Sequence, residues 1–259
     1  MPLSWLPEHG GEVLIQGASR GIGLALVEQC LATERVDRVW ATCREPETAA
    51  HLQELAAAQP QRLRLVPLDV TDEPSIRDAA GMVAAQTDRL HLVLNAAGLL
   101  HDAQRGIRPE KRLEQLDPAA MEALFRVNAT GPLLVARHFL RLLSHGDPAV
   151  VAAISARVGS IADNRKGGWY GYRMSKAALN QGIRTLAIEL GRRAPAVTCA
   201  ALHPGTTDTD LTAPFQSWVP AEKLFPPERT ARQLLGVIDS LRTEDSGGLF
   251  SWDGELIAY

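Results

Sequence analysis

Short apolar segments alternate with helix-patterned segments along almost the whole chain, and this order constrains the fold most strongly. The segments at 90–95 and 149–154 are continuously apolar, which is typical of strands buried on both faces. Strands separated by helices indicate a parallel sheet, and right-handed crossovers then place helices on both of its faces. The alternation therefore predicts an α/β fold: a single-domain, Rossmann-like, doubly wound parallel sheet of about seven strands.

The periodicity also gives approximate bounds for these elements. Strands are expected at 12–16, 38–42, 63–68, 90–95, 149–154 and 196–202, with a weaker one near 248–251. Helices are expected at 21–32, 46–58, 74–86, 118–143, 171–191 and 227–241. With no linker or repeat visible, residues 1–259 are expected to form one dinucleotide-binding and catalytic domain. The irregular segments 99–117 and 206–226 follow strand ends, where such sheets bind ligands, and 206–226 is expected to form a substrate flap.

Composition and charge exclude several classes of protein. A formal net charge of -3 argues against nucleic-acid binding, which needs a basic face. No apolar run approaches the ~20 residues that a membrane span requires, and no secretory signal is visible. The cysteines at 30, 43 and 199 are far apart and odd in number, which predicts buried thiols in a reducing, cytoplasmic setting. The histidines are scattered without ligand spacing, so no metal site is expected.

A glycine-rich loop follows the first expected strand. The sequence from Val13 to Gly23 reads as a strand, a tight turn and the start of a helix. Glycines there let the backbone approach a diphosphate, and a helix N-terminus favours negative charge. Such turns also arise for packing reasons, but the position after the first strand favours a cofactor. The expected cofactor contacts of this loop are Gly17, Ser19, Arg20, Gly21, Ile22 and Gly23.

The end of the second strand indicates which nicotinamide cofactor is used. A site that prefers NAD places a carboxylate about here to hold the ribose hydroxyls. Cys43 takes that place, Arg44 follows it, and Arg20 lies in the glycine loop. Two guanidinium groups without an acid suit a 2′-phosphate, which favours NADP(H) over NAD(H). The alternative is that both arginines are solvated surface residues.

Two further strand ends carry candidate cofactor contacts. Asp69 ends the third strand, where it could accept from an adenine amino group or cap the helix that begins near Pro74. The segment 95–98 closes the fourth strand with small residues, which leaves room for an adenosine or simply permits a sheet-to-helix turn. The expected contacts are Asp69, Val70, Asn95, Ala96 and Gly98.

Tyr172 and Lys176 stand four residues apart on an expected helix, so both side chains project from one face. The ammonium should favour phenolate over phenol and lower the tyrosine pKa from its reference of about 10. A tyrosine placed in this way can donate a proton to a carbonyl oxygen, or accept one from an alcohol, near neutral pH. The alternative is an ordinary half-buried helix tyrosine.

In order and spacing, these residues resemble the short-chain dehydrogenase/reductase superfamily over essentially the whole chain. The resemblance rests on the loop 17–23, Asp69, 95–98, Asn128, Tyr172 with Lys176, and Pro204-Gly205. The stretch 156–176 looks more narrowly like the C-factor and sniffer-type carbonyl reductases. This resemblance implies an NADPH-dependent reduction of aldehydes or ketones by hydride transfer, acting on a small-molecule carbonyl substrate. The helices at 118–143 and 171–191 resemble the pair through which family members form homodimers and homotetramers, although a monomer is not excluded.

The resemblance also assigns roles to individual residues. Tyr172 would act as general acid toward a carbonyl, and Lys176 would hold the nicotinamide ribose while depressing the tyrosine pKa. Asn128 would fix a water chain to Lys176, unless it only bonds a kink within its own helix. The nicotinamide-side loop would comprise Pro204, Gly205, Thr207 through its backbone, and Thr209.

One position departs from the family pattern. The serine that bonds the substrate oxygen normally stands three residues before Gly159, and Ala156 occupies that place. Losing one such donor can reduce turnover on the order of 100-fold or more. Ser155 is the first substitute to consider, although strand alternation would point it away from the site. Ser160 is the second, and a site without any serine donor is the third possibility.

Apolar residues in 206–226 could cover a hydrophobic substrate or dock against the body or a partner subunit; these are Leu211, Phe215, Trp218, Val219 and Leu224. A second functional hypothesis follows from Ala156 and the C-factor resemblance: a cofactor-binding signalling or regulatory protein with weak or incidental catalysis. An NAD-linked alcohol dehydrogenase is disfavoured by Arg44 and the missing acid.

Overall fold

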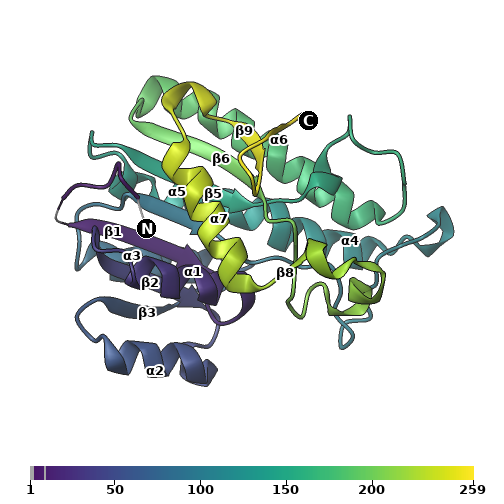
Figure 1. The fold of residues 1–259 in the computed structure, drawn as a ribbon, viewed down its shortest axis with the longest axis horizontal. Coiled ribbons are helices and arrows are strands. Elements are labelled where there is room, and N and C mark those ends of the chain that lie inside the picture. The colour runs from purple at the N-terminus through teal and green to yellow at the C-terminus, as the bar shows by residue number, and fades with distance from the viewer. Residues whose placement is uncertain (1–2, 9) are drawn as a thin grey trace.

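A central sheet with helices on both faces forms the body of the computed structural model, which describes residues 3–8 and 10–259 (Figure 1). The sheet contains β1 (Gly11–Gln16), β2 (Val36–Cys43), β3 (Leu63–Pro67), β4 (Leu92–Asn95), β5 (Ala149–Ile154), β6 (Val197–His203), β9 (Gly248–Ser251) and β10 (Leu256–Ile257). Their order across the sheet is β3-β2-β1-β4-β5-β6-β9-β10, and only the β9–β10 pair is antiparallel. This arrangement confirms the doubly wound parallel sheet.

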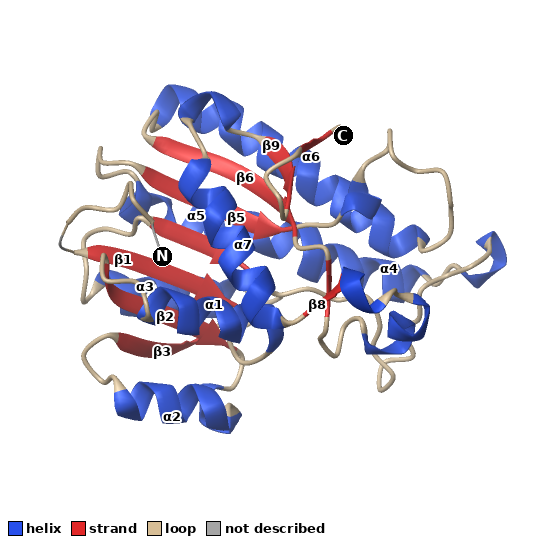
Figure 2. Cartoon of the chain, viewed as in Figure 1, coloured by secondary structure: helices blue, strands red, loops and turns tan. Residues whose placement is uncertain are grey.

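Helices cover the two faces of the sheet in separate groups (Figure 2). They are α1 (Gly21–Leu31), α2 (Ala50–Ala58), α3 (Glu73–Ala84), α4 (Pro118–Phe125), α5 (Gly131–Leu143), α6 (Tyr170–Arg193) and α7 (Pro227–Ser240). Helices α1 and α7 pack together on one face, and α3, α5 and α6 lie on the other. No helix in the described part of the chain is long and apolar enough to cross a membrane.

Side-chain alternation explains why the central strands are continuously apolar. In β1, Val13 and Ile15 belong to the core beneath α1 and α7, whereas Leu14 belongs to the core on the opposite face. All three side chains are fully buried. Both faces of the parallel sheet are covered by helices. The residues that point to either face in the middle of the strand are therefore apolar.

The expected helix at 118–143 is interrupted. A π-helical turn, Arg126–Thr130, separates α4 from α5. Pro132 has no backbone N–H to donate to the carbonyl four residues earlier, which loosens the helical ladder at this point. Gly131 is required beside it, because a Cβ there would overlap the side chain of Val70. The interruption places Asn128 at the site described below.

Three short strands were absent from the sequence prediction. The short strand β10 extends the sheet by an antiparallel edge, and a separate two-stranded sheet joins β7 (Thr206–Thr207) to β8 (Leu224–Phe225). The latter pair ties together the two ends of 206–226. This segment is therefore a closed loop with a hydrogen-bonded base, and it lies beyond the carboxyl ends of the strands (Figure 1).

Candidate active site

The glycine loop forms a cradle, which we define as the hollow over residues 17–23 that side chains at the glycine positions would fill. Gly17 has a φ of +83°, and a Cβ there would lie 2.6 Å from the backbone nitrogen of Ala97. A Cβ at Gly23 would overlap the carbonyl of Gly17, so the helix packs directly on the loop. Helix α1 begins at Gly21 with no side-chain cap and no acidic residue in its first turn. Its free amides and positive dipole end suit a phosphate group, so the cradle fits a dinucleotide.

The ends of β1 and β4 continue this cradle. The backbone amide of Ala96 donates to Gln16, and Asn95 Nδ2 donates to the carbonyl of Ala152. Asn95 Oδ1 is buried without a hydrogen-bond partner, so it is available to a donor from a bound molecule. A Cβ at Gly98 would lie 3.5 Å from a Leu211 methyl group and 4.0 Å from Lys176 Nζ. The small residues therefore border the space next to the lysine.

Asp69 does not cap helix α3, which corrects one of the two alternatives drawn from the sequence. The cap is Asp72, whose carboxylate accepts from the amide of Ser75 at 3.2 Å. Asp69 Oδ1 instead accepts from the amide and the hydroxyl of Thr71, at 2.8 and 2.7 Å. The neighbouring Val70 packs against Gly131.

The segment 206–226 contacts the glycine cradle. Asp210 Oδ2 lies 3.0 Å from Arg20 Nη1, with both side chains well exposed. A Cβ at Gly21 would lie 3.1 Å from Thr209 Cγ2, so Thr209 lies against the glycine loop. Arg44 is exposed directly after β2. Both arginines thus stand at the open side of the cradle.

The base of the flap is fixed by buried contacts. Gly205, next to Pro204, has a φ of +74°, and a Cβ there would press on the rings of Phe225 and Trp252. The Thr207 hydroxyl lies 2.8 Å from that of Thr230, and both are buried. Because the Thr207 side chain points inward, only its backbone can face a ligand.

Tyr172 and Lys176 project together from the first two turns of α6. Tyr172 is 8% exposed and Lys176 is 2% exposed, and Lys176 Nζ lies 5.8 Å from the phenol ring centre. Nζ donates to the carbonyl of Ile154 at 2.8 Å. Burial raises the pKa of the Tyr172 phenol above its ordinary value and lowers the pKa of Lys176 to about 7. The sequence led us to expect a lowered tyrosine pKa, but desolvation disfavours the phenolate and determines the direction here.

Asn128 connects the loop after β4 to helix α6. Its Oδ1 accepts from the amide of Leu99 at 2.8 Å, and its Nδ2 donates to the carbonyl of Leu99 at 2.7 Å. Nδ2 also lies 3.0 Å from the hydroxyl of Ser175, which in turn donates to the carbonyl of Tyr172. These contacts correct the alternative that Asn128 bonds only within its own helix.

Ala156 stands where the family pattern has a serine. Ala156 packs in one apolar cluster with Tyr172. Ser155 is 1% exposed, and its hydroxyl donates to Asn180 Oδ1 at 2.6 Å. The hydroxyl of Ser160 donates to the carbonyl of Ala258. Ser155 would therefore have to break its hydrogen bond to Asn180 to reach a substrate, and Ser160 would have to break its hydrogen bond to the Ala258 carbonyl.

Apolar side chains enclose Tyr172 and Ala156. The buried members of the cluster are Leu100, Ile107, Ala123 and Leu124, and Trp169, Leu211 and Phe215 pack against them. Two of the five apolar residues expected in 206–226, Leu211 and Phe215, thus pack against this cluster, whereas Trp218 is 77% exposed. Trp169 was not predicted from the sequence, although the two glycines before it indicate an unusual backbone at this point.

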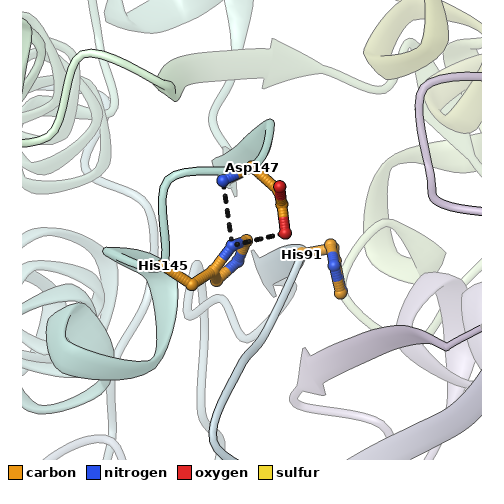
Figure 3. A group of neighbouring side chains, drawn as sticks. All are labelled: His91, His145 and Asp147. Atoms are coloured by element: carbon orange, nitrogen blue, oxygen red, sulfur yellow. Dashed lines mark hydrogen bonds and ion pairs between the residues drawn. The ribbon is translucent and has the colours of Figure 1, made fainter.

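Three side chains outside this site, His91, His145 and Asp147, have potential metal-binding atoms within 4.8 Å of one another (Figure 3). His91 Nδ1 accepts from the amide of Glu12, and His145 Nδ1 accepts from the amide of Asp147. The Asp147 carboxylate is paired with Arg89 at 3.3 Å. Backbone amides thus occupy the Nδ1 lone pair of each histidine, His145 Nε2 bonds the carbonyl of Leu90, and an arginine pairs with the Asp147 carboxylate. These contacts account for the cluster except for His91 Nε2, which is buried without a hydrogen-bond partner in the described structure.

Comparisons with known proteins agree with this geometry. The short chain dehydrogenase family model matches residues 12–220. The NADPH-bound carbonyl reductase from chicken fatty liver is 32% identical, with a TM-score of 0.85 over 96% of this chain and 98% of its own. The carbonyl reductase Sniffer of D. melanogaster is 25% identical, with a TM-score of 0.84 over 97% of this chain and 100% of its own. C-signal of Myxococcus xanthus is 39% identical over 57% of this chain and 83% of its own length.

Proposed function

Because the chain belongs to the short-chain dehydrogenase family and is an oxidoreductase of that family, we propose that it reduces aldehydes or ketones with NADPH. The observation that carries this proposal is the pairing of Tyr172 and Lys176 on α6, next to a glycine cradle and inside an apolar cluster. The cradle would hold the cofactor diphosphate, and the apolar walls would take an uncharged substrate.

The preference for NADPH is supported by charge. Arg20 and Arg44 stand at the open side of the cradle, and Cys43 takes the place of the carboxylate that an NAD site would use. An arginine pair would bind a 2′-phosphate through charge-assisted hydrogen bonds. Arg20 would exchange its exposed partner Asp210 for that phosphate, at little cost because exposed ion pairs contribute little.

Bound nicotinamide would supply the hydride, and this chain's residues would manage the proton. Tyr172 would hold its proton on the phenol oxygen, because burial raises its pKa, and would release it to the carbonyl oxygen as negative charge develops there. Lys176 would orient the cofactor ribose and, when protonated, stabilise the phenolate left behind. Asn128 would hold the loop at Leu99 in a fixed position relative to the start of α6, through its hydrogen bonds to Leu99 and Ser175.

The test is the rate of NADPH and NADH oxidation by the purified protein with aldehydes, ketones and quinones. We expect turnover with NADPH to exceed that with NADH. Binding of NADPH without turnover on any carbonyl would contradict the proposal. That outcome would favour the second candidate, a signalling protein with weak catalysis, which Ala156 and the similarity to C-signal support.

A further inference from the structure

Trp169 has a strained backbone immediately before the helix that carries Tyr172. Its φ of 53° and ψ of 45° lie in the left-handed region, and among the described residues it is the sole non-glycine residue with a positive φ. A side chain with a Cβ is disfavoured in this region, and most of all a bulky one. Such strain persists only where the surroundings enforce it, and it is concentrated at functional sites.

Glu110 holds this conformation through hydrogen bonds to the amides of Trp169 and Gly171. Its backbone carbonyl accepts from the amide of Trp169, and its carboxylate accepts from the amide of Gly171, with both oxygens at 3.3 Å. Glu110 is 4% exposed, and it supplies the N-terminal cap that no nearby residue of α6 provides. A Cβ at Gly171 would lie 3.0 Å from a Glu110 oxygen, so the contact depends on glycine at this position.

The strained conformation places the indole of Trp169 at the reacting end of the site. Its ring centre lies 6.2 Å from that of Tyr172 in an edge-to-face arrangement and 4.9 Å from that of Phe215 in the flap. Both spacings fall within the range in which aromatic rings attract one another. On the same cluster, Ala156 offers a substrate carbonyl no side-chain hydrogen bond. Apart from the Tyr172 phenol, contacts with aromatic rings are therefore the specific contacts that this cluster can offer to a substrate.

We propose that Trp169 is a specificity-determining residue that selects carbonyl compounds bearing an aromatic ring, with Glu110 as the residue that positions it. This inference rests on the proposed reductase function and names its substrate class. The substrate ring would pack against the indole on the side of the apolar cluster that contains Tyr172. Its carbonyl would then face the Tyr172 phenol.

The test compares acetophenone with cyclohexyl methyl ketone, which differ mainly in the aromaticity of the ring. We measure the ratio of their kcat/KM values in wild type, Trp169→Leu and Trp169→Phe, so that intrinsic reactivity cancels between variants. The leucine variant should lower the ratio about two- to tenfold, the range expected for one aromatic pair, and the phenylalanine variant should retain most of it. The matched control is Trp218→Leu, in the exposed part of the flap, which should leave the ratio unchanged.

An unchanged ratio in Trp169→Leu, or an equal loss in Trp218→Leu, would overturn the proposal. If wild type reduces neither ketone, the inference is decided by binding instead, and the proposed function is decided separately by turnover on the wider set of aldehydes, ketones and quinones. Calorimetry would then compare 1-phenylethanol with 1-cyclohexylethanol on the NADP⁺-loaded protein. Preference for the phenyl compound in wild type but not in Trp169→Leu supports the role of Trp169, and equal binding in both refutes it.

The strained backbone of Trp169 has a readout that is independent of substrate, and Glu110 is tested by its effect on the aromatic preference. Trp169→Gly and Trp169→Ala both remove the indole, but only glycine adopts the left-handed backbone without strain. The glycine variant should therefore unfold at a higher urea concentration than the alanine variant, and a reversed order would refute enforced strain. Glu110→Gln should lower the aromatic preference in the same direction as Trp169→Leu, whereas equal losses on both ketones would assign Glu110 a purely structural role.

Discussion

The substitution Ala156→Ser should raise reductase activity while lowering stability. Ala156 has extended backbone angles, φ -155° and ψ 147°, which serine also adopts, so the change adds one hydroxyl without backbone strain. Ala156 belongs to the same apolar cluster as Tyr172, so we expect the new hydroxyl to lie near the carbonyl that Tyr172 would protonate.

The magnitude follows from two opposing effects. Removing one donor from an oxyanion site costs about 100- to 1,000-fold in kcat, and adding one to this site should return on the order of 10- to 100-fold in kcat/KM. That gain corresponds to about 1.4–2.8 kcal/mol of transition-state stabilisation. In the cofactor-free protein the hydroxyl would be buried among apolar groups, which should lower the free energy of unfolding by about 1–3 kcal/mol.

The assay pairs kcat/KM for an aromatic ketone with urea unfolding of each variant. Ala153→Ser is the control, because Ala153 on β5 is also buried, at 1% exposed against 9% for Ala156, but belongs to the core on the α5 and α6 face. It should lose stability without gaining activity. Ser155→Ala should cost stability through the bond to Asn180 and leave kcat/KM within about threefold. If Ala156→Ser leaves kcat/KM unchanged, or Ser155→Ala removes most of it, the assignment of the missing donor to position 156 is wrong.

Three further predictions concern the acid, the cofactor and pH. Tyr172→Phe should leave NADPH binding intact and reduce kcat by about 100-fold or more, and unchanged turnover would contradict the role of the phenol as acid. Arg44→Ala should raise the Kd for NADPH far more than the Kd for NADH, and equal increases measured by calorimetry would refute 2′-phosphate recognition. Burial lowers the pKa of both His91 and His203 to about 4. As pH falls, these histidines therefore take up protons in the unfolded chain before they do so in the folded protein. The free energy of unfolding should be at its full value above about pH 6.5 and decline toward pH 4. His91→Asn should flatten that decline in urea midpoints, and an unaltered slope would show that His91 does not contribute.

Features set by local chemistry were predictable from the sequence. Continuous apolar runs identified the buried strands β4 and β5, and the glycines at 17, 21 and 23 identified the turn into α1. The spacing of Tyr172 and Lys176 was enough to place both side chains on one face of α6. Each of these features depends on neighbours within a few residues, and the fold class follows from their order.

Features set by long-range packing were not predictable. Glu110 caps a helix that begins sixty residues later in the chain, and the strain at Trp169 exists only because of that contact. The π-helical turn at Arg126–Thr130 needed the fit of Gly131 against Val70 in addition to Pro132. The direction of the tyrosine pKa was missed because its sign depends on how completely tertiary packing excludes water.

The central claim is that this chain transfers a hydride to a carbonyl carbon, and isotope transfer tests it most directly. NADPH carrying deuterium at both C4 positions of the nicotinamide is mixed with wild type and an aromatic ketone, and the product alcohol is examined by mass spectrometry. We predict one deuterium on the carbinol carbon with wild type, and almost no labelled alcohol with Tyr172→Phe. Cofactor that stays reduced with every carbonyl tested, or alcohol formed without the label, would contradict the account.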